Sequence, residues 1–209
     1  MQSQTIDCPP LGVRAEVGSI NRTNRTAELI FSTGAPVDRI DWWSGKRYIE
    51  KLSMDPAHIR LDRLNSGAPL LDSHSAWSVG DILGAVEADS ARIEKGRGVA
   101  TVRFSRRQDV EPVFQDVLDG IVRSVSVGYR VYKFVEETPK DGGTPVRTAI
   151  DWEPFEVSMV PMPADTGAKV RSGDKTGTNP CVIERQSDDA DRHRRFRHAQ
   201  LHVPFMRNL

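Results

Sequence analysis

Residues 119–131, "DGIVRSVSVGYRV", carry the clearest strand pattern of this sequence. Beyond Gly120 the side chains alternate with a period of two, which is the period of a β-strand. One face is apolar and consists of Val125, Val127, Tyr129 and Val131. The other face is mostly small and polar and consists of Ser124, Ser126, Gly128 and Arg130. A small hydroxyl beside a glycine indicates either a β-bulge or ordinary polar face, or a nucleophile with room for a substrate carbonyl.

The segments around this strand predict a β-rich chain. Residues 148–160, "TAIDWEPFEVSMV", form a second strand, and the turn-rich residues 136–147 between the two predict a long hairpin. Further candidate strands, each short and bounded by turn-forming residues, cover 26–33, 46–52, 81–88 and 98–105. Together they suggest a curled β-sheet or barrel.

Two helices are expected between the strands. Residues 55–64 begin with Asp and Pro, a typical helix start, and predict a short helix. Residues 108–120 place apolar side chains at helical spacing, with Pro112 near the start and Gly120 at the end, and predict a helix that packs on the core.

Composition favours an ordinary globular protein. The chain has 209 residues, 38% of them hydrophobic, and no net charge, which fits one soluble, intracellular domain and gives no global argument for nucleic acid or membrane partners. Cys8 and Cys181 stand at opposite ends in loose segments, so both are expected to be free thiols, and no metal or cofactor is expected. From about residue 172 the apolar pattern dissolves, which predicts a disordered tail.

Three residues could carry chemistry. His74 is the one histidine in the middle of the predicted domain, although a lone histidine at a strand end is most often structural. Serine needs a neighbouring base to become a nucleophile, and Ser126 has the space that Gly128 leaves beside it. Glu156 lies between two apolar residues, so it needs a partner: a salt bridge to Arg123 or Arg130, a solvated sheet face and a catalytic role all remain open. Ser124 is the second candidate nucleophile, and Ser158 is a candidate buried hydrogen-bond former.

In this order the motifs resemble the prohead (head maturation) serine proteases of tailed bacteriophages, relatives of the herpesvirus assemblins. The matching stretches are "YIEKLSMDPAHI" (48–59), "PLLDSHSAWSVGDILGAV" (69–86), "DGIVRSVSVGYRV" (119–131) and "EPFEVSMVPMPADTGAKV" (153–170). The resemblance implies an α+β fold rich in strands, a closed or nearly closed β-barrel with a few surrounding helices. It divides the chain into an N-terminal arm (1–11), a protease domain (12–171) and a flexible tail (172–209), which is a possible processing or packaging segment.

Carried over residue by residue, the resemblance implies a serine endopeptidase with His74 as general base and Ser126 as nucleophile. The third member of the triad is Glu156, with Asp72 and Asp151 as alternatives. The implied function is cleavage of scaffold and capsid-protein segments, followed by self-cleavage, in the interior of a prohead assembled in the host cytoplasm. Capsid protein and scaffold are the implied substrates, and a homo-oligomer is possible.

Two alternatives accompany this hypothesis. The same residues could be sheet-face hydrogen bonders in a non-enzymatic β-rich module that acts in capsid assembly or as a scaffold. The basic stretch "DRHRRFRH" (191–198) could touch packaged DNA, but nearby aspartates make a nucleic-acid partner the weaker expectation.

Overall fold

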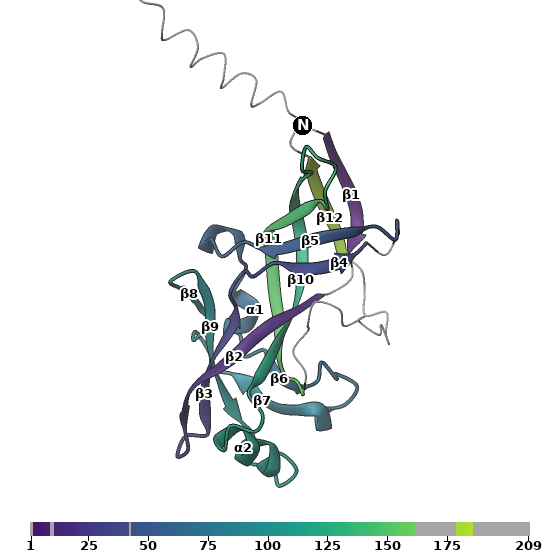
Figure 1. Ribbon diagram of the computed structural model, residues 1–209. Helices are drawn as coiled ribbons and strands as arrows, with labels where there is room; N and C mark the ends of the chain where they lie inside the picture. The colour runs from purple at the N-terminus through teal and green to yellow at the C-terminus, as the bar shows by residue number, and fades with distance from the viewer. Residues whose placement is uncertain (1, 9–10, 42, 162–178, 186–209) are drawn as a thin grey trace, which may run out of the picture.

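The structure, a computed structural model, describes residues 2–8, 11–41, 43–161 and 179–185. Strands dominate them, and in chain order these are β1 (Gln2–Cys8), β2 (Leu11–Asn21), β3 (Thr26–Ser32), β4 (Val37–Ile40), β5 (Arg47–Leu52), β6 (Pro69–Asp72), β7 (Ile82–Val86), β8 (Arg92–Glu94), β9 (Arg97–Phe104), β10 (Ser124–Glu137), β11 (Val146–Met159) and β12 (Asn179–Arg185). The helical elements in the same residues are α1 (Asp62–Asn65), α2 (Glu111–Leu118) and two single 3-10 turns, Pro56–His58 and Val79–Asp81. A β-rich chain with few helices is therefore confirmed (Figure 1).

All the described strands belong to one sheet. Its order is β1-β12-β10-β2-β3-β9-β7-β6-β11-β5-β4, with β8 beside β9 and an additional pairing between β10 and β11. The pairings therefore lead from β10 through β2, β3, β9, β7, β6 and β11 back to β10, while β12 with β1, and β5 with β4, extend outside this ring. The sheet as a whole is not closed, so the expected barrel is not confirmed.

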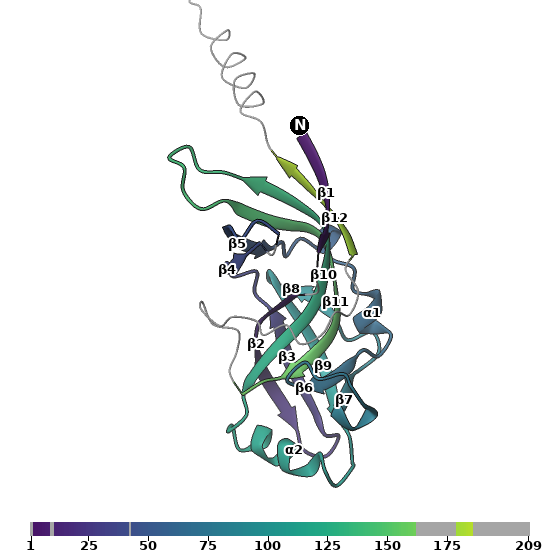
Figure 2. The same cartoon turned by 90° about the vertical axis from the view of Figure 1, so that its right-hand side faces the viewer.

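β10 and β11 pair as the long hairpin that the sequence predicts, and this hairpin lies at the centre of the sheet. Its pairing runs from Val125 opposite Met159 to Glu137 opposite Val146, with register shifts between Gly128 and Tyr129 and near Lys133. The apolar face of β10 is fully buried, as its alternation indicates. Figure 2 shows the hairpin running the length of the molecule, with the ring of strands at one end.

A buried polar cluster fastens β4 and β5 to the hairpin. Tyr129 packs edge-on against Trp152, with ring centroids 5.7 Å apart, and its hydroxyl donates to Glu50. Burial, and then the charge of Glu50, raise the pKa of Tyr129 well above its ordinary value, so the phenol keeps the proton that it donates. Arg39 on β4 donates to the same Glu50 oxygen at 3.3 Å and to the Tyr129 hydroxyl at 3.2 Å.

Helix α2 covers one end of the sheet, as its apolar spacing predicts. Phe114 and Val117 are buried, and the Phe114 ring lies 5.2 Å from Phe104 of β9. On the outer side of Phe114 the guanidinium of Arg25 lies 4.1 Å from the ring centroid and pairs with Glu111 at 2.6 Å. The helix stops before Gly120, whose φ of 71° is a backbone conformation that glycine adopts without strain.

The prediction of a single helix over residues 55–64 is wrong. Asp55 caps only the 3-10 turn Pro56–His58, by accepting from the Ala57 N–H. Ile59 then takes an extended conformation and bridges to Trp152 of β11, while the Arg60 N–H donates to the Trp152 carbonyl at 2.9 Å. This tertiary pairing outweighs the local helical preference, and α1 starts only afterwards.

The prediction of a disordered tail is also wrong in part, because β12 lies inside residues 172–209. It pairs antiparallel with β1 along its length and parallel with residues 133–136 of β10. Cys181 and Ile183 are buried in the core. Cys181 is a free thiol, as expected, but it lies in a strand and not in a loose segment. The other predictions for the tail, including the one for residues 191–198, concern residues outside those that the structure describes. The domain boundaries at 11 and 171 stay predictions.

Burial of Ile183 yields a test of β12. We expect Ile183→Ala to lower the free energy of unfolding by about 2–4 kcal/mol, because it removes a buried aliphatic side chain. Pro180→Ala, at an exposed position of the same strand, is the control and should change it by less than about 0.5 kcal/mol. Chemical denaturation measures both, and equal effects of the two variants would mean that β12 is not docked on the sheet.

Candidate functional site

The three candidate residues of the sequence come from neighbouring strands. β6 runs parallel to β11, with Leu71 opposite Ser158 and Asp72 opposite Met159. The chain leaves β6 directly into the loop that carries His74, so this loop starts beside the end of β11 (Figure 2). On the other side of β11, β10 places Ser126 opposite Ser158 and Gly128 opposite Glu156. Residues directly opposite in an antiparallel pair point to the same face, so these four share one face.

The backbone at His74 is strained and firmly held. Ser73 and His74 have φ values of 49° and 62°, the left-handed region that residues with a Cβ seldom adopt. Hydrogen bonds offset the cost: the Ser73 N–H donates to the Met159 carbonyl at 2.9 Å, and the His74 N–H to Ser158 Oγ at 3.1 Å. The loop is therefore fastened to β11 at two successive residues.

The His74 side chain completes this attachment. Its Nδ1 lies 2.5 Å from Glu156 Oε1, and Ser158 Oγ donates to Glu156 Oε2 at 2.6 Å. As a carboxylate, Glu156 accepts from both neighbours, so each of its oxygens has a donor although its side chain is only 6% exposed. The imidazole is 40% exposed, and the described residues include no hydrogen-bond partner for its Nε2. We call His74, Glu156 and Ser158 the His74 cluster.

Gly128 makes room for this cluster. A Cβ at this position would lie 2.2 Å from Glu156 Oε1 and 2.9 Å from its Cδ, closer than any real contact. Gly128 is thus needed for the carboxylate that lies over it, and the register shift that follows it agrees with the expected β-bulge. The sequence shows a glycine at this position, but only the register reveals which side chain fills the space.

Ser126 lies beside the cluster without joining it. Its hydroxyl is buried and has no hydrogen-bond partner, so it makes no hydrogen bond to His74. An unsatisfied buried hydroxyl costs about 1–3 kcal/mol of folding free energy. The polar face of β10 is therefore covered here, in contrast to the open space that its composition suggested.

The other sequence candidates lie elsewhere or bind other groups. Asp151 forms a two-point ion pair with Arg60, at 2.7 and 2.6 Å, and Asp72 accepts from the Ser73 hydroxyl. Neither side chain forms a hydrogen bond or ion pair with His74 among the described residues. Arg130 stacks on Phe155, with its guanidinium 5.2 Å from the ring centroid. Glu156 therefore pairs with His74 rather than with the arginine that its strand position suggested. Ser124, the spare nucleophile, is half-buried at the start of β10.

Beyond His74 the loop presents two exposed apolar side chains on a rigid backbone. Trp77 and Val79 are 74% and 79% exposed. Asp81 accepts from the N–H groups of Ser78 and Trp77, and hydrogen bonds from Ser78, from the Ser75 side chain and from Trp77 lower the pKa of its carboxyl. Arg107 donates to three carbonyls of the loop at 2.8–2.9 Å, including that of Val79. Sequence reasoning missed this arginine, because it lies 25 to 28 residues further along the chain than the carbonyls that it binds.

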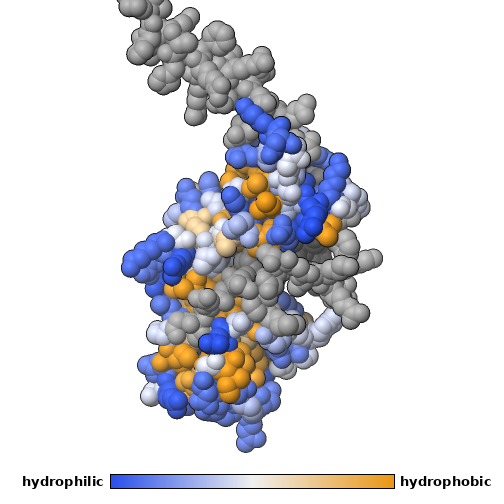
Figure 3. Space-filling model, in the orientation of Figure 1, coloured by the Kyte–Doolittle hydropathy of each residue, from blue (hydrophilic) through white to orange (hydrophobic). Residues whose placement is uncertain are grey.

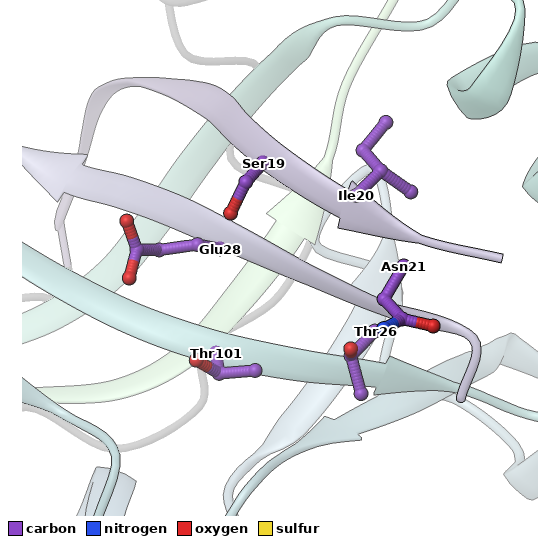
Figure 4. Close-up of a pocket in the computed structure, with 6 residues that line it drawn as sticks. All are labelled: Ser19, Ile20, Asn21, Thr26, Glu28 and Thr101. Atoms are coloured by element: carbon purple, nitrogen blue, oxygen red, sulfur yellow. The ribbon is translucent and has the colours of Figure 1, made fainter. Parts of the chain in front are cut away.

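Neither a candidate metal site among the described residues nor either of the two described depressions includes the cluster. The described residues contain no group of three His, Cys, Asp or Glu side chains that could hold a metal ion. A polar depression of about 330 Å³ lies elsewhere, on β2, β3 and β9, and Figure 4 shows its side chains spread along these strands, with Glu28 pointing away from Asn21 and Thr26. None of the described helices is long and apolar enough to cross a membrane.

Comparison with known proteins relates the chain to a protein of the phage head. It is 34% identical over 158 residues to the major capsid protein of Halomonas phage phiHAP-1, a match that covers 75% of this chain. The chain spans about a quarter, 25%, of the length of that relative. No known protein family matches the sequence, and no solved structure matches it.

This comparison corrects the expected enzyme class. The relative is a major capsid protein, which is a structural protein, so the expectation of a serine endopeptidase is wrong, and membership of the prohead protease family is not confirmed. The missing hydrogen bond between Ser126 and His74 agrees with the correction, since a serine nucleophile needs a base within reach. The grouping of His74 with Glu156 is observed, whereas the roles expected of His74, Ser126 and Glu156 stay predictions.

The contact between Gly128 and Glu156 yields a test of the cluster. We expect Gly128→Ala to lower the free energy of unfolding by about 1–3 kcal/mol, because the new methyl group displaces the Glu156 carboxylate from His74. In a Glu156→Ala background the same change should have little effect, since the obstructing atoms are gone. Chemical denaturation of the four proteins gives the coupling energy. Equal effects in both backgrounds would contradict the described packing.

Proposed function

We propose that this chain is a non-enzymatic, β-rich module of a phage head that acts in capsid assembly. The observation that carries the proposal is the relationship to the phiHAP-1 major capsid protein over three quarters of the chain. The site of action is then the head or its precursor, and the partners are capsid protein and further copies of this chain. The ring of strand pairings supports a compact, barrel-like body for the module.

The His74 cluster supports this proposal as a structural element. It joins the loop after β6 to β11 through backbone and side-chain hydrogen bonds, and thereby fixes the loop that carries Trp77 and Val79. A rigid loop loses little conformational entropy when it binds a partner. The cluster thus serves assembly indirectly, by presenting an apolar surface in one conformation.

Exposed apolar side chains favour contacts with other chains. Large hydrophobic residues are strongly exposed at five described positions, namely Ile40, Trp43, Trp77, Val79 and Ile121. Figure 3 shows apolar residues gathered on the surface at the end of the molecule where α2 lies. Surfaces of this kind mark interaction sites on soluble proteins.

Co-assembly tests the proposal. The chain is co-expressed with the phiHAP-1 major capsid protein, and particles are separated on a sucrose gradient and analysed by mass spectrometry. We expect the chain to sediment with the particles. Ser126→Ala should sediment in the same way, because the Ser126 hydroxyl makes no hydrogen bond that assembly could require.

The control is a double variant, Trp77→Ser with Val79→Ser, which should fold normally because both side chains are exposed, and should sediment with particles several-fold less. A chain that stays at the top of the gradient in its unchanged form would contradict the proposed role. Loss of co-sedimentation on Ser126→Ala alone, with an unchanged melting temperature, would contradict the structural assignment of Ser126.

A further inference from the structure

A cleft lies between the two ends of the open sheet. Outside the ring of strands, β12 and β1 extend from β10, whereas β5 and β4 extend from β11. A cavity of about 450 Å³ is lined from both sides, by Gln4 of β1 and Ile183 of β12, and by Tyr48 of β5 and the turn between β4 and β5. Figure 1 shows these strands together, away from α2 and β7. The cleft shares no residue with the His74 cluster.

The floor of the cleft is a buried ion-pair network of one cation and two carboxylates, with a net charge of minus one. Arg147 of β11 donates to Glu136 and to Asp41, both at 2.8 Å, and its guanidinium lies 4.4 Å from the centroid of the Tyr48 ring. All three charged side chains are at least 87% buried, with exposed fractions of 13%, 8% and 12%. Burial raises the pKa of Asp41, but the hydrogen bonds from Arg147 and Ser44 and the charge of Arg147 together outweigh it, so the pKa is lowered and the carboxylate stays charged and paired.

The rim of the cleft carries two cations, which exceed the single negative charge of the floor and give the lining a net charge of plus one. Lys46 and Arg47 are exposed, and the described residues provide no ion pair for either. Trp43, 77% exposed, lines the same cleft, and Ile40 at the end of β4 is 60% exposed. Two cations beside exposed apolar surface fit a partner that offers carboxylates and aliphatic groups together.

Both strands that border the cleft are edges of the sheet. In the part of the chain that the structure describes, β1 pairs only with β12 and β4 only with β5. The outer backbone groups of an edge strand can pair with an added strand, which is a common mode of peptide recognition. The occupant that matches open edges, cations and apolar side chains is an extended peptide.

We propose that this cleft binds an extended segment of another chain with alternating acidic and aliphatic residues, whose backbone pairs with an open edge of the sheet. Its carboxylates lie against Lys46 and Arg47. Its aliphatic side chains cover Ile40 and Trp43.

Fluorescence anisotropy of a labelled peptide tests this proposal. The probe is an octapeptide that alternates valine with glutamate, and the comparison peptides replace glutamate by lysine or methylate every backbone nitrogen. We expect the acidic peptide to bind about tenfold more tightly than the lysine peptide, as two ion pairs of ordinary strength would give. The methylated peptide should not bind, because it cannot donate to an edge strand.

Charge reversal at the rim provides the matched variant. Lys46→Glu with Arg47→Glu should reverse the preference for the two peptides, whereas Arg22→Glu with Arg106→Glu, an equal charge change elsewhere on the surface, should leave it unchanged. Equal melting temperatures establish that both variants fold. The proposal is overturned if the acidic peptide does not bind, if methylation has no effect, or if the rim and control variants behave alike. It is overturned equally if sedimentation shows the cleft filled by a second copy of this chain.

Discussion

The antiparallel pairing of β10 with β11 is the constraint on which the rest of the molecule depends. At one end it closes the ring of hydrogen-bonded strands, and at the other it supports the two sheet ends that border the cleft. Its register also decides which side chains meet, since it sets Gly128 against Glu156 and Ser126 against Ser158. A slip by one residue would turn every one of these side chains to the opposite face.

Burial of the Glu156 carboxylate shows how this pairing builds the candidate site. A buried charge is costly unless hydrogen bonds satisfy it, and here His74 and Ser158 provide one to each oxygen. The same contacts hold the loop in its left-handed conformation, so the cost of burial and the cost of strain are offset together. Ser126 remains outside this network, and its unsatisfied hydroxyl is a local cost that nothing in the described residues relieves.

The sequence predicted those parts of the fold that depend on local pattern. The alternation in β10 and β11 and the helical spacing of α2 were sufficient for their elements, and the need of Glu156 for a partner was correctly inferred. Prediction failed where contacts between distant residues decide the local structure. Ile59 is extended because it bridges to Trp152. β12 was missed because it has too few apolar residues to stand out among the turn formers around it. The function inferred by resemblance failed because a Ser, His and acid in the right order do not fix the role of the serine.

We therefore propose that His74, Glu156 and Ser158 hold the loop after β6 in place and that Ser126 is not a nucleophile. Reaction with a serine-directed fluorophosphonate, followed by intact mass measurement, tests this claim most directly, with Ser126→Ala as the control. We predict no fluorophosphonate adduct on Ser126, because its hydroxyl is buried and has no hydrogen bond to a base that could take its proton. A stoichiometric adduct on the unchanged chain that is absent from Ser126→Ala would contradict it.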